Sequence, residues 1–330
     1  MNAITTELRS SDLLASTWQD LVDGCWERFV GSLPEGLQAD ARLLPLTLRL
    51  TPKPLPWSRI FHQEVTLGLP FTLAEALPSA SPAEVRTAVE AHMLGIVAAF
   101  GADRIDDGQV EATPELVRVL DEVRRARDAA IDSFGVGGVG PTYDYRAADL
   151  ATTEANRAEQ EFLALHASAT TATYEELSRP KQYLVFPAAM TFSRAAGLGD
   201  ASLSQVEAMC LAMAMGLQLR DDATDWEDDH AEGRAWAVRL MLQREGEGVY
   251  LRDIESLRLR MADSGVVVEL LRGAVRHFEA ASAAASALAA HRVAAWCDRQ
   301  ASLTQELAAR EDEAPGHIVR WEKARKQARA

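Results

Sequence analysis

The sequence predicts an all-α protein, and three features of the 330-residue chain support this fold class. Proline is sparse, with 13 residues gathered mostly in the first third of the chain and around residues 141 and 180. The long stretches between these prolines are rich in Ala, Leu, Glu and Arg, which favour helix. No segment shows a clear period-two alternation, the pattern of a half-buried strand. We therefore expect roughly ten helices and no sheet.

The first predicted elements are two helical regions separated by a proline-rich segment. Apolar residues at 3/4 spacing from Leu13 to Trp26 predict a helix within residues 1–35. Five prolines within residues 34–58 predict a loop or extended segment. Ser81-Pro82-Ala83-Glu84 combines an N-cap serine, a first-turn proline and an early acid, so a helix should begin there and run into residues 103–107.

The rest of the chain is also expected to be helical. Thr113-Pro114-Glu115 predicts a second capped start, with a helix to about residue 134. The glycine-rich run 135–141 is the clearest break in the sequence, but it is too short to establish a domain boundary. One domain over residues 1–330 is therefore expected. The later helices are predicted at about 147–177, 181–197, 202–231, 234–244, 249–262, 265–290 and 291–311.

Charge and apolar composition exclude several classes of protein. The chain has 34 basic and 49 acidic side chains, a formal net charge of −15, which argues against a general nucleic-acid grip and against attraction to a membrane surface. Three widely spaced cysteines form no CxxC pair, which fits a reducing compartment. The N-terminus lacks a signal pattern, and no apolar run is long enough to span a bilayer. We expect a cytoplasmic protein without stable membrane insertion.

The most informative stretch is the acidic segment that follows the apolar run 206–219. At about 100° per residue, Asp222, Asp225 and Asp229 lie on one helix face, and Asp221 begins an overlapping stripe. Like charges at this spacing destabilise a bare helix, so the pattern favours a bound cation. Oxygen ligands without Cys or paired His suit hard ions, Mg²⁺ above all. The alternative interpretation is a solvated acidic face.

A second acidic cluster ends the helix predicted from Ser81. Asp103 and Asp107 lie four residues apart on one face, with Asp106 beside them. If the two clusters face each other, their carboxylates could hold several Mg²⁺ ions around a diphosphate leaving group.

These motifs resemble those of the class I isoprenoid synthases, which include trans-prenyl diphosphate synthases, squalene/phytoene synthases and class I terpene cyclases. Asp221-Asp222-Ala-Thr-Asp225, after Gly216-Leu-Gln218-Leu, is similar to the second DDxxD motif of prenyl diphosphate synthases. Asp225-Trp-Glu-Asp-Asp229, followed by Gly233-Arg234-Ala-Trp236, is similar to the second DxxxD of squalene/phytoene synthases. Asp103-Arg-Ile-Asp-Asp107 matches the first DxxxD of that group.

A third element extends the resemblance over about residues 85–240. Arg179-Pro-Lys181-Gln-Tyr-Leu-Val-Phe186 is similar to the prenyl synthase helix whose lysine faces the diphosphate. The resemblance implies an all-α class I terpenoid synthase-like bundle around a central apolar cavity, a prenyl diphosphate substrate and a homodimer.

The candidate site residues fall into three groups. The predicted metal ligands are Asp103, Asp106, Asp107, Asp221, Asp222, Asp225 and Asp229, and the predicted catalytic residues are Asp103, Asp107, Asp222, Asp225, Arg234 and Lys181. The predicted substrate-binding residues are Lys181, Gln218, Arg220, Arg234, Phe100 and Tyr183. The alternative for each cation is a surface charge or a local ion pair, and for each aromatic residue it is core packing.

Departures from the family decide which reaction we expect. Chain-elongating synthases carry an N-terminal Gly-Lys-x-x-Arg-Pro element, which residues 45–62 do not reproduce. Arg124-Arg125 lies further beyond the first motif than the family's Arg-Arg pair. The terpene cyclase triad of Asn, Ser/Thr and Glu is also missing.

We therefore expect a Mg²⁺-dependent terpene cyclase with an unusual second motif, which ionises a C15 or C20 allylic diphosphate to a carbocation. The alternatives are a prenyltransferase that elongates or couples head to head, a non-catalytic partner subunit, and a purely structural acidic bundle.

Overall fold

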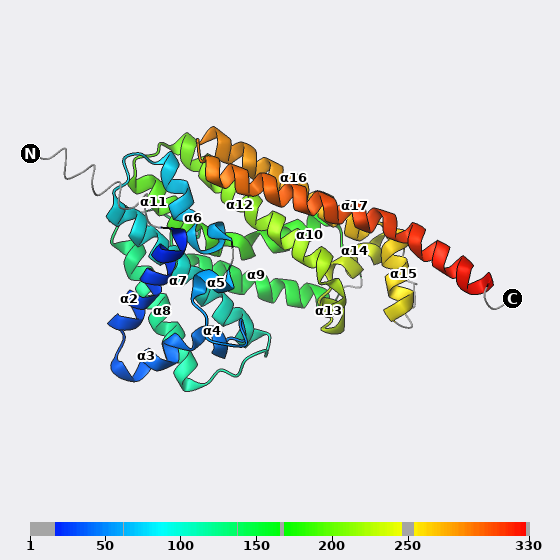
Figure 1. The fold of residues 1–330 in the computed structure, drawn as a ribbon, viewed down its shortest axis with the longest axis horizontal. Helices are drawn as coiled ribbons and strands as arrows, with labels where there is room; N and C mark the ends of the chain where they lie inside the picture. Colours follow the sequence, from blue (N-terminus) through cyan, green and yellow to red (C-terminus); the bar gives the residue numbers. More distant parts are fainter. Residues whose placement is uncertain (1–16, 62, 137, 166–167, 246–253, 328–330) are drawn as a thin grey trace, which may run out of the picture. The chain divides into compact units, whose positions relative to one another are not determined.

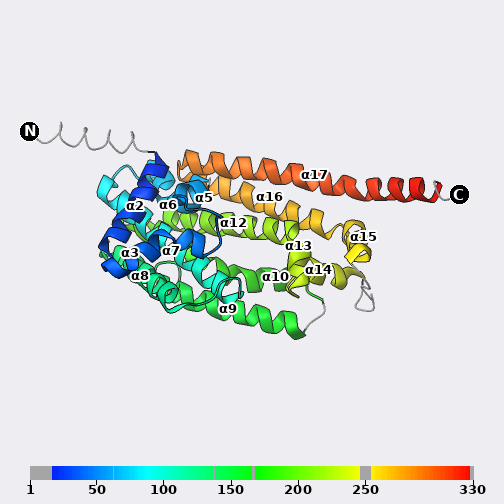
Figure 2. The ribbon, with the colours of Figure 1, turned by 60° about the horizontal axis from the view of Figure 1, so that its bottom comes forward.

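The structure is a computed structural model that describes residues 17–61, 63–136, 138–165, 168–245 and 254–327. These residues form α-helices and short 3₁₀-helices without any strand, which confirms the predicted all-α class (Figures 1 and 2). The elements are α2 Trp18–Ser32, α3 Glu35–Arg42, α4 Leu44–Thr47, α5 Trp57–Ile60, α6 Glu64–Leu73, η1 Ala74–Ala76, α7 Pro82–Asp106, α8 Pro114–Asp132, α9 Tyr145–Leu165, α10 Thr171–Ser178, η2 Arg179–Val185, α11 Phe186–Ala195, α12 Asp200–Thr224, α13 Trp226–Ala231, α14 Trp236–Glu245, α15 Ile254–Ser264, α16 Val266–Ala287 and α17 His291–Gln327.

The chain divides into two compact units. Unit 1 comprises Met1–Leu150, Tyr183–Glu207 and Ala285–Val293, and unit 2 comprises Ala151–Gln182, Ala208–Ala284 and Ala294–Ala330. Each unit is built from segments far apart in the sequence. The expectation of one domain over residues 1–330 stays a prediction.

Unit 1 is organised around α7, which packs against α2, α6, α8 and α11. The Ser81 hydroxyl accepts a hydrogen bond from the Glu84 amide, which confirms the predicted N-cap serine. The Glu84 carboxylate also accepts a hydrogen bond from the Ser81 amide, so the two residues form a capping box. Thr113 caps α8 in the same way, through a bond from the Leu116 amide. These two caps begin the long helices whose apolar faces form the core of the unit.

A buried arginine joins α8 to the beginning of α9 in unit 1. The Arg127 side chain is 1% exposed, and its guanidinium donates to both carboxylate oxygens of Asp149, at 3.1 and 2.7 Å. It also donates to Asp128 at 3.0 Å and lies 4.4 Å from the centroid of the Tyr145 ring. That ring packs against Gly95 of α7, where an added Cβ would lie 2.7 Å from it. Close helix packing thus depends on a residue without a side chain.

Unit 2 contains α10, α12 from Ala208 onward, and the helices α13 to α17. Phe278 of α16 covers Gly216 of α12, where an added Cβ would lie 2.9 Å from the ring. Phe278 also meets Trp296 of α17 edge to face, with ring centroids 6.0 Å apart. Both ribbon views show α16 and α17 side by side (Figures 1 and 2). Buried aromatic and aliphatic side chains therefore hold these three helices together.

The proline-rich segment 34–58 differs from its prediction. It contains the short helices α3, α4 and α5 instead of an uninterrupted loop. Pro34 and Pro56 are the N-cap residues of α3 and α5, and Pro45 occupies the first turn of α4. Proline begins a helix without cost at these positions, because the first turn needs no backbone donor.

Two predicted helices are also divided in the structure. The predicted helix 147–177 is split into α9 and α10, and Thr170 caps α10 through a bond from the Thr173 amide at 3.1 Å. The predicted helix 181–197 begins as the 3₁₀ segment η2 and becomes α-helical at Phe186. Residues 1–16 and 249–253 of other predicted helices lie outside the described residues.

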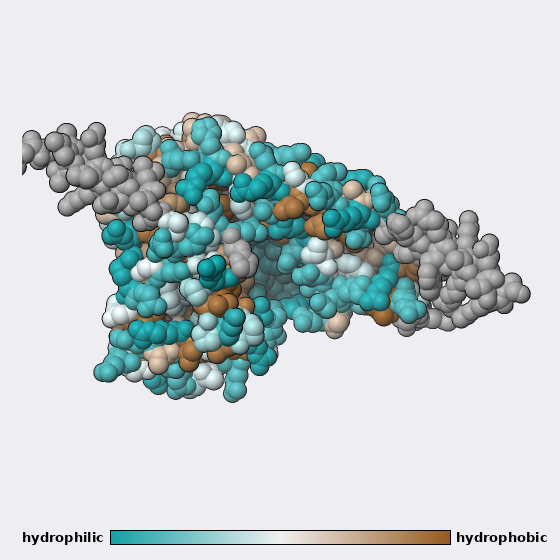
Figure 3. Space-filling model, viewed as in Figure 1, coloured by the Kyte–Doolittle hydropathy of each residue, from teal (hydrophilic) through white to brown (hydrophobic). Residues whose placement is uncertain are grey.

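α7 is the one helix among the described residues that is long and apolar enough to cross a membrane, and 61% of its most apolar stretch is buried inside the protein. A core helix of this kind passes the same length and composition test. The face seen in Figure 3 is mostly hydrophilic over the described residues, with apolar side chains scattered across it.

His92 of α7 is expected to make folding pH-dependent. Burial lowers the pKa of this imidazole to about 4, and a ring nitrogen lies 3.0 Å from the Thr66 carbonyl oxygen. The unfolded His92 side chain takes up its proton near pH 6.5, whereas the folded one does so near pH 4. The neutral buried imidazole therefore contributes fully to the free energy of unfolding above pH 6.5, and this contribution is lost as pH falls toward 4. Urea unfolding of the protein and of His92→Gln from pH 7 to 4 should diverge by up to about 3 kcal/mol. The exposed His291→Gln variant should follow the parent, and parallel curves for His92→Gln would contradict this expectation.

Replacing Arg127 by Met should destabilise the protein. The substitution keeps the apolar volume but removes the guanidinium that pairs with Asp149, while Asp128 keeps its ion pair with Arg146 at 3.0 Å. Because the Asp149 side chain is 36% exposed, we expect a loss of about 2–3 kcal/mol, below the usual cost of breaking a fully buried pair. Urea unfolding measures this loss, and Arg118→Met on the exposed face of α8 is the matched control. Equal stability of the two variants would show that the buried pair does not hold α8 to α9.

Candidate active site

The second aspartate cluster lies in unit 2, where α12 meets α13. Asp225 is the N-cap of α13, with φ −106° and ψ 13°, so the continuous helix predicted over 202–231 is wrong at this residue. The Thr224 hydroxyl donates to the Asp221 carbonyl at 3.2 Å, a side-chain bond of the kind that competes with helix continuation. The Asp225 amide still donates to the Asp221 carbonyl at 2.9 Å, and the Asp229 amide donates to the Asp225 carbonyl at 3.1 Å. The four-residue spacing of the acids therefore survives the break.

Asp222 is the buried acid of this cluster. It is 7% exposed, and its two oxygens accept hydrogen bonds from Tyr174 Oη at 2.6 Å and from Gln218 Nε2 at 3.1 Å. Burial raises the pKa of Asp222 to about 7, against the opposing effects of Tyr174, the Lys181 charge and Gln218. The carboxyl group that began the predicted metal face is thus held inside the unit by two donors.

The neighbouring acids repel one another. Partial loss of hydration and the charge of Asp225 raise the pKa of Asp221, although the charge of Arg220 opposes this rise. Burial, with the charges of Asp221, Asp225 and Glu232, raises the pKa of Asp229 to about 6, although Arg234 opposes this rise. A cation placed among these carboxylates would relieve the repulsion.

A divalent cation fits the chemistry of this donor set. Within the described residues, no group of three or more His, Cys, Asp or Glu side chains is arranged so that the protein alone could hold a metal ion. Mg²⁺ in phosphate-binding sites uses one or two carboxylates and takes its other ligands from phosphate and water. Asp221, Asp225 and Asp229 offer carboxylates for this mode of binding.

Lys181 contacts a carboxylate outside the aspartate motif. Its ammonium donates to Glu159 of α9 at 2.7 Å, and the other Glu159 oxygen accepts a bond from the indole of Trp236 at 2.6 Å. The Trp236 ring stacks on Phe162, with centroids 5.7 Å apart, and meets Tyr174 edge to face at 5.2 Å. Lys181, Glu159, Trp236, Tyr174 and Asp222 therefore form one connected cluster in unit 2.

The two predicted arginines have different surroundings. Arg220 donates to Gln300 of α17 at 2.5 Å and lies 5.6 Å from the Phe278 ring centroid. Arg234 pairs with Glu232, and its charge lowers the pKa of Asp229. Arg220 in turn opposes the rise in the pKa of Asp221, so each arginine acts on one acid of the cluster. The substrate-binding role of both side chains stays a prediction.

The first aspartate cluster lies in unit 1, at the carboxyl end of α7. Asp103 and Asp106 are exposed in its last turn, and Asp107 is the half-buried C-cap residue. The Asp107 amide donates to the Asp103 carbonyl at 2.9 Å, and Gly108 takes φ +67° to turn the chain. The predicted four-residue spacing of Asp103 and Asp107 is confirmed, and the metal-binding role of the three acids stays a prediction.

The two predicted aromatic contacts pack against other rings in unit 1. Phe100 lies 5.0 Å from Phe61, and Tyr183 lies 5.8 Å from Phe186 in an edge-to-face contact. Both are half-buried. Both rings therefore pack against other side chains of the protein, and their contact with substrate stays a prediction.

The prediction of the site from the sequence missed Tyr174 and Glu159, and it assigned Trp236 no role. Tyr174 is 48 residues from Asp222, and Glu159 is 22 residues from Lys181. Neither lies in a motif, and pairing across such separations leaves no periodic signal. Trp236 is the last residue of the Gly233-Arg-Ala-Trp236 motif, and its place in this motif is the one feature of the sequence that could have identified it.

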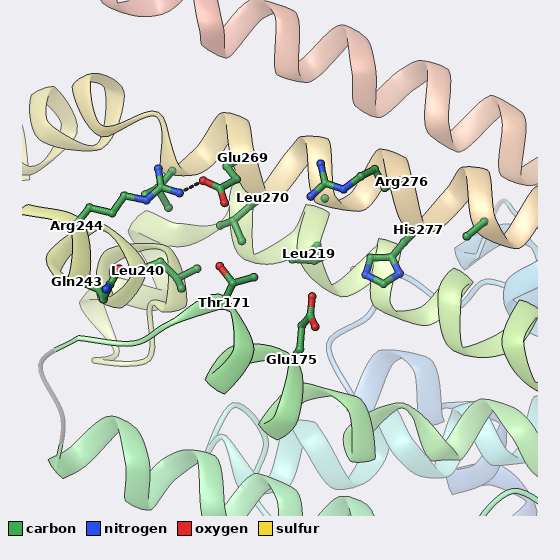
Figure 4. A pocket seen from close by; sticks show the side chains of 13 residues that line it. Thr171, Glu175, Leu219, Leu240, Gln243, Arg244, Glu269, Leu270, Arg276 and His277 are labelled. Atoms are coloured by element: carbon green, nitrogen blue, oxygen red, sulfur yellow. Dashed lines mark ion pairs between the residues drawn. The ribbon is translucent and has the colours of Figure 1, made fainter.

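Unit 2 also contains a separate cavity of about 380 Å³ between α10, α12, α14 and α16. Leu219, Leu240 and Leu270 supply apolar walls. Figure 4 shows the Arg244–Glu269 ion pair at one end and Arg276 with His277 at the other. None of the residues predicted from the sequence lines this cavity.

Comparison with known proteins gives one informative likeness. No protein-family model matches the chain, and no curated protein matches it. The structure is similar to the crystal structure of a polyprenyl synthase from Caulobacter crescentus, complexed with calcium and isoprenyl diphosphate. The match has a TM-score of 0.61 and 17% identity, and it covers 90% of this chain and 96% of that chain. At this identity the likeness concerns the fold alone: the chain has an all-α fold similar to that of this polyprenyl synthase.

Proposed function

We propose that the protein is a metal-dependent enzyme that ionises an allylic prenyl diphosphate. The observation that carries this proposal is the carboxylate cluster at the α12–α13 junction. Its acids repel one another, and the charges of Lys181 and Arg234 act on them. Carboxylates that repel one another, close to cations with further N–H donors, match a metal–diphosphate complex.

The residues of unit 2 have distinct proposed roles. Asp221, Asp225 and Asp229 would hold Mg²⁺, which when bound neutralises charge on the diphosphate oxygens. Lys181 and Arg234 would bind leaving-group oxygens and stabilise the charge that develops as the carbon–oxygen bond breaks. Gln218 and Tyr174 hold Asp222 in place at the base of the cluster. In unit 1, Asp103, Asp106 and Asp107 keep their predicted metal-binding role as part of the proposal.

Cyclisation of one allylic substrate is the reaction we propose first. The chain lacks the N-terminal element with which elongating synthases grip a second substrate. Its Arg124-Arg125 pair is occupied locally, because Arg124 contacts Asp121 at 3.2 Å and Arg125 contacts Glu122 at 2.8 Å. All four residues lie on α8, so neither arginine needs a second substrate as its ion-pair partner.

Prenyl transfer is the second candidate. The similar structure is a polyprenyl synthase complexed with isoprenyl diphosphate, and that name favours coupling to a second isoprenoid. Both candidates share the ionisation step, so the acids and cations of unit 2 have the same roles in each.

Incubation with C10, C15 and C20 allylic diphosphates separates the candidates. We expect a hydrocarbon or terpene alcohol from one allylic substrate, formed in Mg²⁺ and not in EDTA, and detected by GC–MS. A longer diphosphate formed only with isopentenyl diphosphate would identify an elongating prenyltransferase instead. A coupled hydrocarbon would identify head-to-head transfer. Failure of every combination would overturn the enzymatic proposal and favour the partner-subunit alternative.

Asp225→Ala should strongly lower the turnover rate while the protein stays folded. Asp225 is an exposed N-cap residue whose side chain makes no capping bond, so its loss should cost little stability. Removing a metal ligand should lower turnover by about 100-fold or more, since several kcal/mol of charge stabilisation depend on it. Asp228→Ala, which removes an exposed acid from the same short helix, is the matched control and should retain activity. Equal turnover of both variants and the parent would refute the metal role.

A further inference from the structure

We propose that Glu159 is a positioning residue for diphosphate recognition, which orients the Lys181 ammonium toward the leaving group without touching it. This inference rests on the function proposed above. It concerns a residue outside every motif that the sequence revealed.

Both carboxylate oxygens of Glu159 are used by donors from other parts of unit 2. One oxygen accepts from Lys181 Nζ at 2.7 Å, and the other accepts from Trp236 Nε1 at 2.6 Å. The Glu159 and Lys181 side chains are 13% and 21% exposed, so water screens the pair only partly. One carboxylate thus joins η2 to α9 and to the first residue of α14.

The indole fixes the direction in which Glu159 points. Trp236 is buried between the Phe162 ring, at 5.7 Å, and the Tyr174 ring, at 5.2 Å. A ring packed on two sides cannot follow a moving carboxylate, so its N–H holds one Glu159 oxygen in place. The other oxygen then presents a fixed acceptor to Lys181, whose four-carbon stem would otherwise sample many rotamers.

The ammonium held in this way still has capacity for an anion. A lysine carries three N–H donors, and Glu159 takes one of them. The Lys181 charge also acts on Asp222, which places it near the acidic cluster. Lys181 therefore contacts the positioning carboxylate and acts electrostatically on Asp222, the buried acid of the cluster.

The negative charge of Glu159 and its proposed positioning role predict opposite effects of Glu159→Gln on diphosphate binding. A carboxylate near an anionic ligand repels it, so on charge alone the neutral variant Glu159→Gln should bind diphosphate more tightly. A positioning role predicts the opposite. The indole and the ammonium bind different Glu159 oxygens, and glutamine replaces one of these oxygens by an NH2 group, so one of the two donors would face another donor.

The experiment titrates inorganic diphosphate in Mg²⁺ into the full chain by calorimetry. We expect Glu159→Gln to weaken binding about tenfold, as expected for losing a charge-assisted hydrogen bond. The Glu161→Gln variant removes the same charge from an exposed position on α9 and should stay within about twofold of the parent. Trp236→Phe keeps the ring but removes the indole donor, and it should weaken binding about threefold. Denaturant unfolding of each variant confirms that the folded protein is being compared.

A double-mutant cycle separates positioning from a merely structural role. If Glu159 acts through Lys181, the double variant Glu159→Gln/Lys181→Gln should bind diphosphate no more weakly than Lys181→Gln alone. With the substrate that the wild type turns over, Glu159→Gln should lower kcat/KM by the same factor as it weakens binding. Additive losses in the double variant would overturn the positioning role.

Two results distinguish failure of this inference from failure of the proposed function. Unchanged or tighter binding by folded Glu159→Gln, while the wild type binds and turns over substrate, would overturn the role of Glu159 and leave the function standing. Wild-type protein that binds no diphosphate and turns over no allylic substrate would overturn both.

Discussion

A carboxylate removed from water sets the arrangement of the polar cluster in unit 2. Asp222 is 7% exposed, and a carboxyl group at such a depth needs hydrogen-bond donors in place of water. Tyr174 and Gln218 supply those donors, which ties α10 to α12. Tyr174 can reach Asp222 because its ring packs on Trp236, whose indole is held in turn by Glu159. The requirement to satisfy one buried acid thus extends through aromatic packing to α14 and α9.

The same acid shows how function and stability share residues in this unit. A metal-binding face needs carboxylates close together, and their mutual repulsion raises their pKa values, as burial also does. The acids of this cluster differ in how far they are buried. Asp222 is buried and held by two donors, whereas Asp221 and Asp225 are exposed. Exposed acids can change ligands without disturbing the core, while the buried one keeps α12 against α10.

Local signals in the sequence predicted a large part of this structure. Ser81 and Thr113 could be assigned as helix caps because capping depends on residues within one turn. Asp222, Asp225 and Asp229 were placed on one helix face from their spacing. The backbone hydrogen bonds from Asp225 to Asp221 and from Asp229 to Asp225 continue the four-residue pattern across the break. The break itself was missed, since a competing hydroxyl bond from Thr224 has no periodic signature. The short helices α3, α4 and α5 were missed because the prolines of segment 34–58 were interpreted as helix breakers. The partners of Asp222 and Lys181 come from distant segments, and no spacing rule identifies them.

The position of Trp236 gives the protein an optical property of its own. Its indole donates to a carboxylate and touches two other rings, so the energy of its excited state depends on the charges and dipoles of this cluster. Any event that shifts Lys181 or Tyr174 changes the local field on this chromophore. Among the seven tryptophans of the chain, Trp236 is thus one whose emission would change if a ligand moved these side chains. The chain contains a reporter of its own candidate site, built from the contact that holds its lysine in place.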